Sequence, residues 1–197
     1  SRLSDSRQII VDREGINVKS VKPVSASKVE VEFEVPADSS PGLYPIRLVS
    51  ETGLSNVMMF SVGVLPNVEE KEPNSEFATP QAIEKNVTVE GAVAREDEDY
   101  YVVELKEGES LTAELEGVRI KKGRSNPFFD PYVAILNSER FEMATSDDAP
   151  LLQQDCLCSM RAPADGKYII VVRDSSFGGS NDRYRLHVGS YPRPIAV

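Results

Sequence analysis

A strict two-residue alternation in residues 28–35, KVEVEFEV, constrains the fold more than any other feature of the sequence. Val29, Val31, Phe33 and Val35 occupy every second position, and glutamates fill the positions between them. Because successive side chains of a β-strand point to opposite faces, this segment has one apolar and one acidic face when extended. The pattern predicts a half-buried antiparallel strand and argues against an amphipathic helix, whose apolar residues recur every three to four positions.

Similar short apolar segments recur through the first third of the chain. Turn-like stretches such as PADSSPG and ETGLSN separate them. Five short strands with turns between them predict a small β-sandwich over residues 1–65. The expected strands are residues 7–13, 16–24, 28–35, 43–50 and 57–64.

Residues 65–86, LPNVEEKEPNSEFATPQAIEKN, interrupt this pattern. They contain three prolines and no apolar alternation, so we place the domain boundary here and expect a linker at residues 66–80. Within this stretch, FATPQAI (77–83) is expected to form a single helical turn, with Asn74 or Ser75 as its N-cap.

The strand pattern resumes after the linker. Eight segments separated by turn-like stretches predict a second, jelly-roll-like sandwich over residues 81–197. The chain is therefore expected to be all-β, with two β-sandwich domains in tandem and the second jelly-roll-like. The eight expected strands are residues 87–93, 100–106, 110–117, 131–137, 141–145, 155–162, 167–174 and 184–191.

The charge of the chain limits its partners. A net charge of −10 argues against nucleic acid and anionic membrane, because both attract Lys and Arg rather than carboxylates. No apolar run reaches the roughly 18 residues of a membrane span. Acids concentrate between Glu69 and Glu116, where 15 of them face 4 bases. The polar opening, SRLSDSRQ, suggests a piece excised from a longer protein, so the missing signal segment says nothing about the compartment.

The residues that most enzymes need are sparse. His187 is the only histidine, no G-x-S-x-G motif accompanies a serine, and His187 is expected to share a solvated strand face with Arg185. Cys156 and Cys158 are expected to be buried, unbridged thiols, with a redox or metal role as the alternative. We predict that the protein is not an enzyme, and keep a hydrolase with an unusual acidic site as an alternative.

Two loop features leave a binding function open. The basic run RIKKGR (119–124) is expected to be a solvated loop, with binding of an acidic ligand as the alternative. Phe128 and Phe129 in NPFFDP are expected to pack within the protein, with an exposed aromatic platform as the alternative. A carbohydrate- or matrix-protein-binding module is therefore a second functional hypothesis.

The acidic segments suggest a cation site. Glu70, Glu72 and Asn74 recur at every second position, and Pro73 favours the extended backbone that points all three the same way. Ca²⁺ takes six to eight oxygen ligands, so further donors are needed, and REDEDYY (95–101) is the obvious source. Carboxylates packed together without a cation repel one another. The alternative is a solvated linker without an ion.

Several motifs in a fixed order resemble the bacterial pre-peptidase C-terminal domain. They are EKEPNSEFATPQAI, VEGAVAREDEDYYVVEL, FDPYVAILN, SDDAP, APADGKYIIVVRD and YRLHV, and they extend over about residues 69 to 190. The resemblance implies a jelly-roll-like sandwich that is appended to exported proteins and is not itself catalytic.

The same resemblance implies bound Ca²⁺, with Glu96 as a substitute ligand. Ser75 departs from the family, whose members with a full site more often have Asp or Asn there, and this puts some affinity or a second ion in doubt. Related collagenase domains bind collagen, but their tyrosine pattern is not recognisable here, so collagen is not carried over. The ligands implied by position are Glu70, Glu72, Asn74, Asp97 and Asp99.

The first part of the chain has a weaker resemblance. VPADSSPGLYPIRLVSETGLSNVMMFSVG is similar to the end of a bacterial Ig-like or IPT/TIG-type module. Together, the two resemblances imply a non-catalytic accessory module of a larger exported bacterial protein that is secreted, periplasmic or on the cell surface. Its expected roles are spacing, secretion support or binding. Its expected partners are other domains of the parent chain and extracellular polysaccharide or protein.

Overall fold

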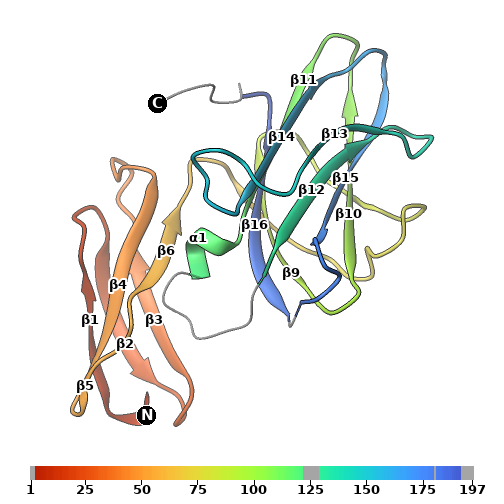
Figure 1. The fold of residues 1–197 in the computed structure, drawn as a ribbon. Coiled ribbons are helices and arrows are strands. Elements are labelled where there is room, and N and C mark those ends of the chain that lie inside the picture. The colour runs from red at the N-terminus through yellow and green to blue at the C-terminus, as the bar shows by residue number, and fades with distance from the viewer. Residues whose placement is uncertain (1–2, 122–128, 180, 192–197) are drawn as a thin grey trace. The chain divides into compact units, whose positions relative to one another are not determined.

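The computed structural model describes residues 3–121, 129–179 and 181–191, and this part of the chain is almost entirely β (Figure 1). Its helical elements are a 3-10 turn at Leu3–Asp5 and one short helix, α1 (Val118–Lys121). None of the helices found in the described residues is long and apolar enough to cross a membrane. The chain divides into two compact units. The first contains the residues up to Val64 and the short stretch Ile120–Ser125, and the second contains the rest of the chain from Leu65 onward. The predicted all-β class is confirmed.

The first unit contains two antiparallel sheets. In the larger sheet, β4 is central and pairs with β1 along one edge and with β5 and β6 along the other. The smaller sheet is the hairpin of β2 and β3. The strands are β1 (Ser6–Val11), β2 (Asn17–Pro23), β3 (Val29–Glu34), β4 (Gly42–Ser50), β5 (Gly53–Leu54) and β6 (Met58–Val62).

Strand β3 shows the alternation expected from its sequence. Its apolar residues are partly buried and its glutamates exposed, and the ring of Phe33 packs on that of Phe60 with centroids 4.7 Å apart. The apolar face of β3 therefore meets the other sheet, as in a sandwich. The expected burial of Val35 is wrong, since this side chain is 44% exposed. The ladder ends at Glu34, and Pro36 has no N–H with which to continue it.

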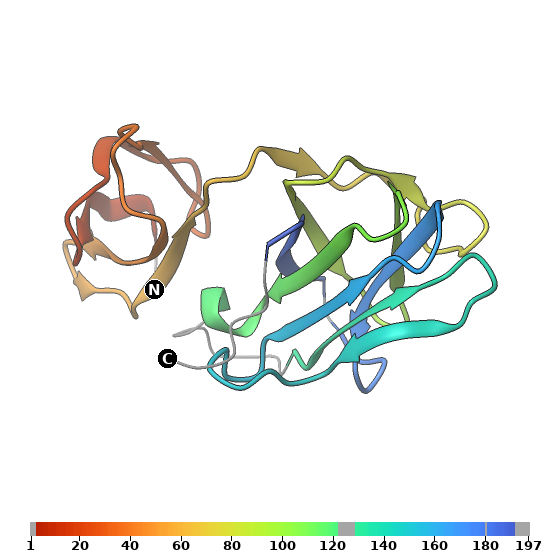
Figure 2. The ribbon, with the colours of Figure 1, turned by 90° about the horizontal axis from the view of Figure 1, so that it is seen from above.

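The second unit consists of two five-stranded sheets stacked face to face (Figure 1, Figure 2). Their strand orders are β13-β12-β15-β10-β8 and β14-β11-β16-β9-β7. From β9 to β16, every connection except β12–β13 crosses between the sheets, which is the topology of a jelly roll. The strands are β7 (Asn67–Glu69), β8 (Gln81–Ala82), β9 (Val87–Val93), β10 (Glu98–Leu105), β11 (Ser110–Glu116), β12 (Pro131–Leu136), β13 (Glu142–Ser146), β14 (Cys156–Arg161), β15 (Gly166–Asp174) and β16 (Asp182–Gly189).

The main core lies between these two sheets and follows from the two-residue period of the strands. Tyr101 on β10 and Tyr184 on β16 belong to opposite sheets, are both buried, and have hydroxyl oxygens 2.5 Å apart. Cys156 and Cys158 on β14 are also part of this core, buried as predicted and not joined by a disulfide. Side chains at alternate positions of each strand therefore fill the space between the sheets.

The segment expected to be a linker, residues 66–80, contributes one edge strand to the second unit, and a second edge strand, β8, follows directly after it. Residues Asn67–Glu69 form β7, which pairs parallel to β9, and Val68 packs against the main core. The expected helical turn at 77–83 is wrong. A single hydrogen-bonded turn joins Thr79 N to Glu76 O, and Gln81–Ala82 then pairs with β10, which requires an extended backbone.

Candidate metal centre

Three carboxylates from separate parts of the second unit converge at one end of β10. Glu72, Asp97 and Asp99 each place an oxygen within 4.8 Å of the others. Glu72 lies in the segment between β7 and β8, Asp97 in the turn after β9, and Asp99 in β10. The carbonyl of Asn74 accepts a hydrogen bond from the N–H of Tyr100 at 3.0 Å, and this bond holds the Glu72 segment beside β10.

Local hydrogen bonds orient the more exposed members of this carboxylate cluster. Asp97 accepts the N–H of Ala94 at 3.2 Å with one oxygen and the hydroxyl of Ser75 at 3.0 Å with the other. Glu72 accepts the N–H of Asn74 at 3.0 Å. These short-range bonds place each carboxylate at the cluster and leave part of its acceptor capacity unused.

Two oxygens in the site are buried without a partner. Asp99 is fully buried; its Oδ2 accepts the hydroxyl of Tyr184 at 2.7 Å, but its Oδ1 has no partner in the described structure. Asn74 is also fully buried; its amide donates to Glu70 at 3.3 Å, while its Oδ1 is unpartnered. Burying a polar atom without a partner costs about 1–3 kcal/mol. Both oxygens therefore call for a positive or hydrogen-donating group.

The raised pKa of Asp99 also indicates that the cluster calls for a positive or hydrogen-donating group. Burial, followed by repulsion from Glu70 and Asp97, raises the pKa of Asp99 to about 9, although the hydrogen bond from Tyr184 opposes this shift. Carboxylates this close cannot all carry their charge at neutral pH unless a cation compensates them.

Glu70 is not one of the three carboxylates that converge, because its oxygens bind other groups of the protein. Its Oε1 accepts hydrogen bonds from the hydroxyls of Tyr101 at 2.8 Å and Tyr184 at 3.0 Å, and its Oε2 accepts the N–H of Ala92 at 2.9 Å. Glu70 therefore positions Asn74 and Tyr184 from behind the cluster, with its own oxygens already engaged. Glu96, the expected substitute, is largely exposed and lies 3.6 Å from Arg95.

The donor set fits a hard divalent cation. Carboxylate and amide oxygens are the ligands of Ca²⁺ and Mg²⁺, and the cluster contains neither histidine nor cysteine. Glu72, Asp97, Asp99 and the Oδ1 of Asn74 would supply part of such a shell, and the two buried, unpartnered oxygens would then have a partner. The tyrosine pair behind the site, Tyr101 and Tyr184, was not found by sequence reasoning, although its inward positions on two strands could have indicated it.

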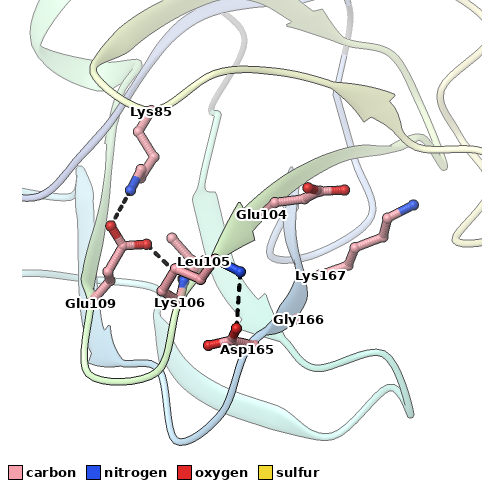
Figure 3. Close-up of a pocket in the computed structure, with 8 residues that line it drawn as sticks. All are labelled: Lys85, Glu104, Leu105, Lys106, Glu109, Asp165, Gly166 and Lys167. Carbon is pink, nitrogen blue, oxygen red and sulfur yellow. Dashed lines mark hydrogen bonds and ion pairs between the residues drawn. The ribbon is translucent and has the colours of Figure 1, made fainter.

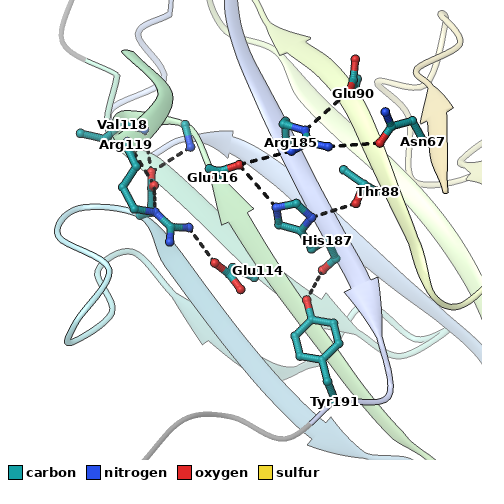
Figure 4. Close-up of polar contacts among 12 residues, drawn as sticks. Asn67, Thr88, Glu90, Glu114, Glu116, Val118, Arg119, Arg185, His187 and Tyr191 are labelled. Carbon is teal, nitrogen blue, oxygen red and sulfur yellow. Dashed lines mark hydrogen bonds and ion pairs between the residues drawn. The ribbon is translucent and has the colours of Figure 1, made fainter. Parts of the chain in front are cut away.

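The strand face expected to be solvated is instead largely buried, and its polar side chains contact one another (the contacts are drawn in Figure 4). His187 contacts Thr88 Oγ1 at 2.8 Å and Glu116 at 3.5 Å, and Arg185 donates to Asn67 at 3.1 Å. The expectation of a wet face is therefore wrong, because neighbouring strands contribute polar partners that cover it. His187 lies in a network of mutual polar contacts, and the Thr88 hydroxyl that it contacts is fully buried.

The basic run begins in an ion-pair cluster. Arg119 lies 2.6 Å from Asp155. It also lies 2.7 Å from Glu114 (Figure 4). Asp155 also accepts the N–H groups of Gly117 and Val118, at the start of α1. At Arg119, the expected solvated loop is therefore wrong. Residues 122–128, with most of the remaining run and Phe128, lie outside the described residues.

Phe129, the second expected aromatic, is 3% exposed and belongs to the main core. The expectation that Phe129 packs within the protein is confirmed. Phe129 therefore cannot belong to an exposed aromatic platform. Its ring lies close to the backbone at Gly117, where an added Cβ would approach it to 2.5 Å.

A shallow hollow of about 480 Å³ lies at the opposite end of β10 (Figure 3). Lys85 and Glu109 are 2.6 Å apart, and Lys106 and Asp165 are 2.9 Å apart, so most of its charges neutralise one another. It has no aromatic lining residue on which a sugar ring could stack. The residues that line it are Lys85, Glu104, Leu105, Lys106, Glu109, Asp165, Gly166 and Lys167.

Fold and site together define an all-β protein with a carboxylate cluster at one end of a jelly roll. No family model and no curated protein matches the chain.

Among solved structures, the chain is similar to the pre-peptidase C-terminal domain of a collagenase from Bacillus anthracis, at 14% identity over 64% of this chain and 99% of that one, with a TM-score of 0.43. It is also similar to PliG from Aeromonas hydrophila, a periplasmic inhibitor of g-type lysozyme, at 14% identity over 55% and 95% of the chains, with a TM-score of 0.41. The secreted serine protease VesC from Vibrio cholerae matches at 12% identity over 96% and 44%, with a TM-score of 0.36. At these identities and TM-scores, the similarities assign neither family nor function.

Proposed function

We propose that the second unit is a calcium-stabilised, non-catalytic module of a larger exported bacterial protein. The observation that carries the proposal is the pair of buried, unpartnered oxygens, Asp99 Oδ1 and Asn74 Oδ1, beside the carboxylates of Glu72 and Asp97. A bound Ca²⁺ would supply the positive charge that offsets carboxylate repulsion. The residues would join the segment before β8, the turn after β9, and β10.

The proposed ligands differ in what they do. Glu72, Asp97 and Asp99 would hold the ion by their carboxylates and Asn74 by its amide oxygen, whereas Glu70 would orient the amide of Asn74 from behind. Ser75 donates its hydroxyl to Asp97 and brings no charge, which favours one ion rather than two.

Exported modules commonly bind calcium weakly, with dissociation constants of about 10⁻⁴–10⁻³ M. A partly exposed site of this kind is suited to calcium-rich surroundings, and we place the protein outside the cytoplasm for that reason. We propose that the first unit is an Ig-like spacer and that the other domains of the parent chain are the partners. Polysaccharide or matrix protein is a weaker candidate, since Phe129 is buried and the hollow of Figure 3 has no aromatic lining residue.

Thermal unfolding of the whole chain tests the proposal. We expect calcium to raise the melting temperature of the wild type and Glu72→Ala to abolish the shift, because Glu72 is a direct ligand. Glu76→Ala is the matched control: this acid lies in the same segment but outside the carboxylate cluster, so the calcium shift should persist. Identical melting curves with calcium and with a chelator would refute the proposed site.

A further inference from the structure

The outer face of the β13-β12-β15-β10-β8 sheet has a buried apolar patch on β12 and β15. An antiparallel sheet packed on one core usually exposes a polar second face to water. Here four outward-facing residues form a second small cluster and are between 0 and 8% exposed. Some other part of the chain must cover them. The four are Ala134, Leu136, Ile169 and Val171.

Phe77 is part of that cover. It lies in the segment between β7 and β8 and packs against the cluster together with Tyr100. The two rings meet edge to face, with centroids 6.0 Å apart and planes at 84°. The guanidinium of Arg140, from the turn between β12 and β13, lies 4.5 Å from the centre of the Phe77 ring. Phe77 thus contacts Tyr100 of the sheet and the Arg140 guanidinium.

The segment that carries Phe77 also carries two of the proposed calcium ligands, Glu72 and Asn74. On β10, Asp99 and Tyr100 are adjacent, so their side chains point to opposite faces of the strand. Asp99 points to the carboxylate cluster and Tyr100 lies against Phe77. The ion site and the cover over the outer cluster are therefore built on neighbouring residues of both segments.

Few other bonds hold this segment in place. Of residues 71–80, all of which the structure describes, only Asn74 makes a backbone–backbone hydrogen bond to the rest of the unit, from its carbonyl to Tyr100 N. The side-chain bond from Ser75 to Asp97 leads back to the carboxylate cluster. A change at the carboxylate cluster would therefore act on the segment that carries Phe77, which is otherwise held by the bond from Lys71 N to Gln81 Oε1 at 2.8 Å.

We propose that the cation latches Phe77 over the outer apolar cluster, so that calcium controls whether this surface is covered. With the ion bound, Glu72 and Asn74 are tied to β10 and Phe77 seals the cluster. Without it, carboxylate repulsion loosens the segment and uncovers an apolar surface beside Tyr100. This inference rests on the proposed calcium site and adds its regulatory consequence.

Nuclear magnetic resonance of the whole chain, with calcium and then with excess chelator, tests the latch, and calorimetry measures calcium binding in parallel. With calcium, we expect cross-relaxation between the Phe77 and Tyr100 rings and a slowly exchanging Tyr100 amide. With chelator, the ring contact should disappear and amide exchange should become at least about tenfold faster, since the bond to Asn74 opens.

Variants of Phe77 test the reverse effect, which is whether the cover over the outer cluster changes the affinity for calcium. Phe77→Ala should weaken calcium binding about fivefold, the lower end of the usual coupling between two sites, because the ion no longer gains from sealing the cluster. Phe77→Leu should weaken it less and covers the case in which the alanine variant fails to fold. Phe141→Ala is the control: that phenylalanine is 64% exposed and outside the cluster, so the affinity should not change.

The outcomes separate the two proposals. If calcium binds by calorimetry but the Phe77–Tyr100 contact and amide exchange stay the same in chelator, the latch is refuted and the calcium module stands. Wild-type affinity in a folded Phe77→Ala variant would also refute the latch. If no calcium binds, both proposals fall together.

Discussion

At the residue scale, the buried carboxylates of Asp155 and Asp99 differ in how many of their oxygens have a hydrogen-bond donor. Asp155 is surrounded by donors, including Arg119 and the N–H groups at the start of α1. Asp99 is equally buried but keeps one oxygen without a partner. A carboxylate with a full set of donors stabilises the fold by itself, whereas one without them depends on its protonation or on an ion.

Asp99→Asn is expected to separate the effect of protonating Asp99 from the effect of a bound ion. Asparagine has nearly the shape of a protonated aspartic acid and carries no charge, so in chelator the variant should melt at the wild-type temperature or above it. Calcium should no longer raise that temperature, because the ion loses a charged ligand. Differential scanning calorimetry with calcium and with chelator measures both effects. A variant that melts well below the wild type in chelator would show that the Asp99 charge is compensated without an ion.

Asp155→Ala is expected to destabilise the second unit by about 3–5 kcal/mol. The change leaves Arg119 without its closest partner and removes the acceptor for several backbone N–H groups, as in other broken buried ion pairs. Denaturant unfolding with the linear extrapolation measures the loss. Asp165→Ala is the control, since its bond to Lys106 is exposed and should matter little. Equal losses in both variants would contradict the distinction.

At the scale of elements, the Tyr184 side chain of β16 packs directly over Gly91 of the paired strand β9, behind the metal centre. Gly91 on β9 faces Tyr184 on β16, and a Cβ at Gly91 would lie 2.5 Å from the Tyr184 hydroxyl and 2.9 Å from Glu70 Oε1. The absence of a side chain at Gly91 is therefore what lets Tyr184 and Glu70 share the space behind the cluster.

Gly91→Ala is expected to cost about 1–3 kcal/mol by overpacking and to weaken calcium binding by shifting Glu70 and Tyr184. Gly166→Ala is a matched control, because nothing lies within 4 Å of a Cβ there. Thermal unfolding and calorimetric calcium titration of both variants test the difference. If the two variants behave alike, the packing of Tyr184 and Glu70 over Gly91 does not shape the site.

At the scale of the whole molecule, the two units differ in how much core they have. In the described part of the first unit, the buried apolar side chains are Ile9, Ile16 and Tyr44. The second unit has a large core between its sheets and a smaller cluster on one outer face. All the proposed calcium ligands belong to the second unit.

Calorimetry of the whole chain is therefore expected to show two unfolding transitions, the earlier one from the first unit, because less apolar surface is buried there. Calcium should raise only the later transition. A single transition, or a calcium shift of the earlier one, would contradict the assignment of the ion to the second unit.

Local patterns of apolar and polar residues predict much of the fold. The two-residue period identifies the longer strands, and β9 matches its expected range, Val87–Val93, at both ends. Strand periodicity is sufficient there because it depends only on neighbouring residues. It fails at Asn67–Glu69 and Gln81–Ala82, which are strands only because β9 and β10 offer them backbone partners.

By itself, the sequence determined the all-β class and the acidic segments from which the candidate site is built, since alternation, prolines and charge are local properties. The resemblance to a known family had already grouped Glu72, Asp97 and Asp99 in one site, but only the tertiary structure decided what each expected ligand contacts. It engaged Glu70 with two tyrosines, left one oxygen of Asp99 without a partner in the described structure, and placed Phe77 over the outer apolar cluster. The physical reason is that alternation says which way a side chain points, while long-range strand pairing decides what it meets there.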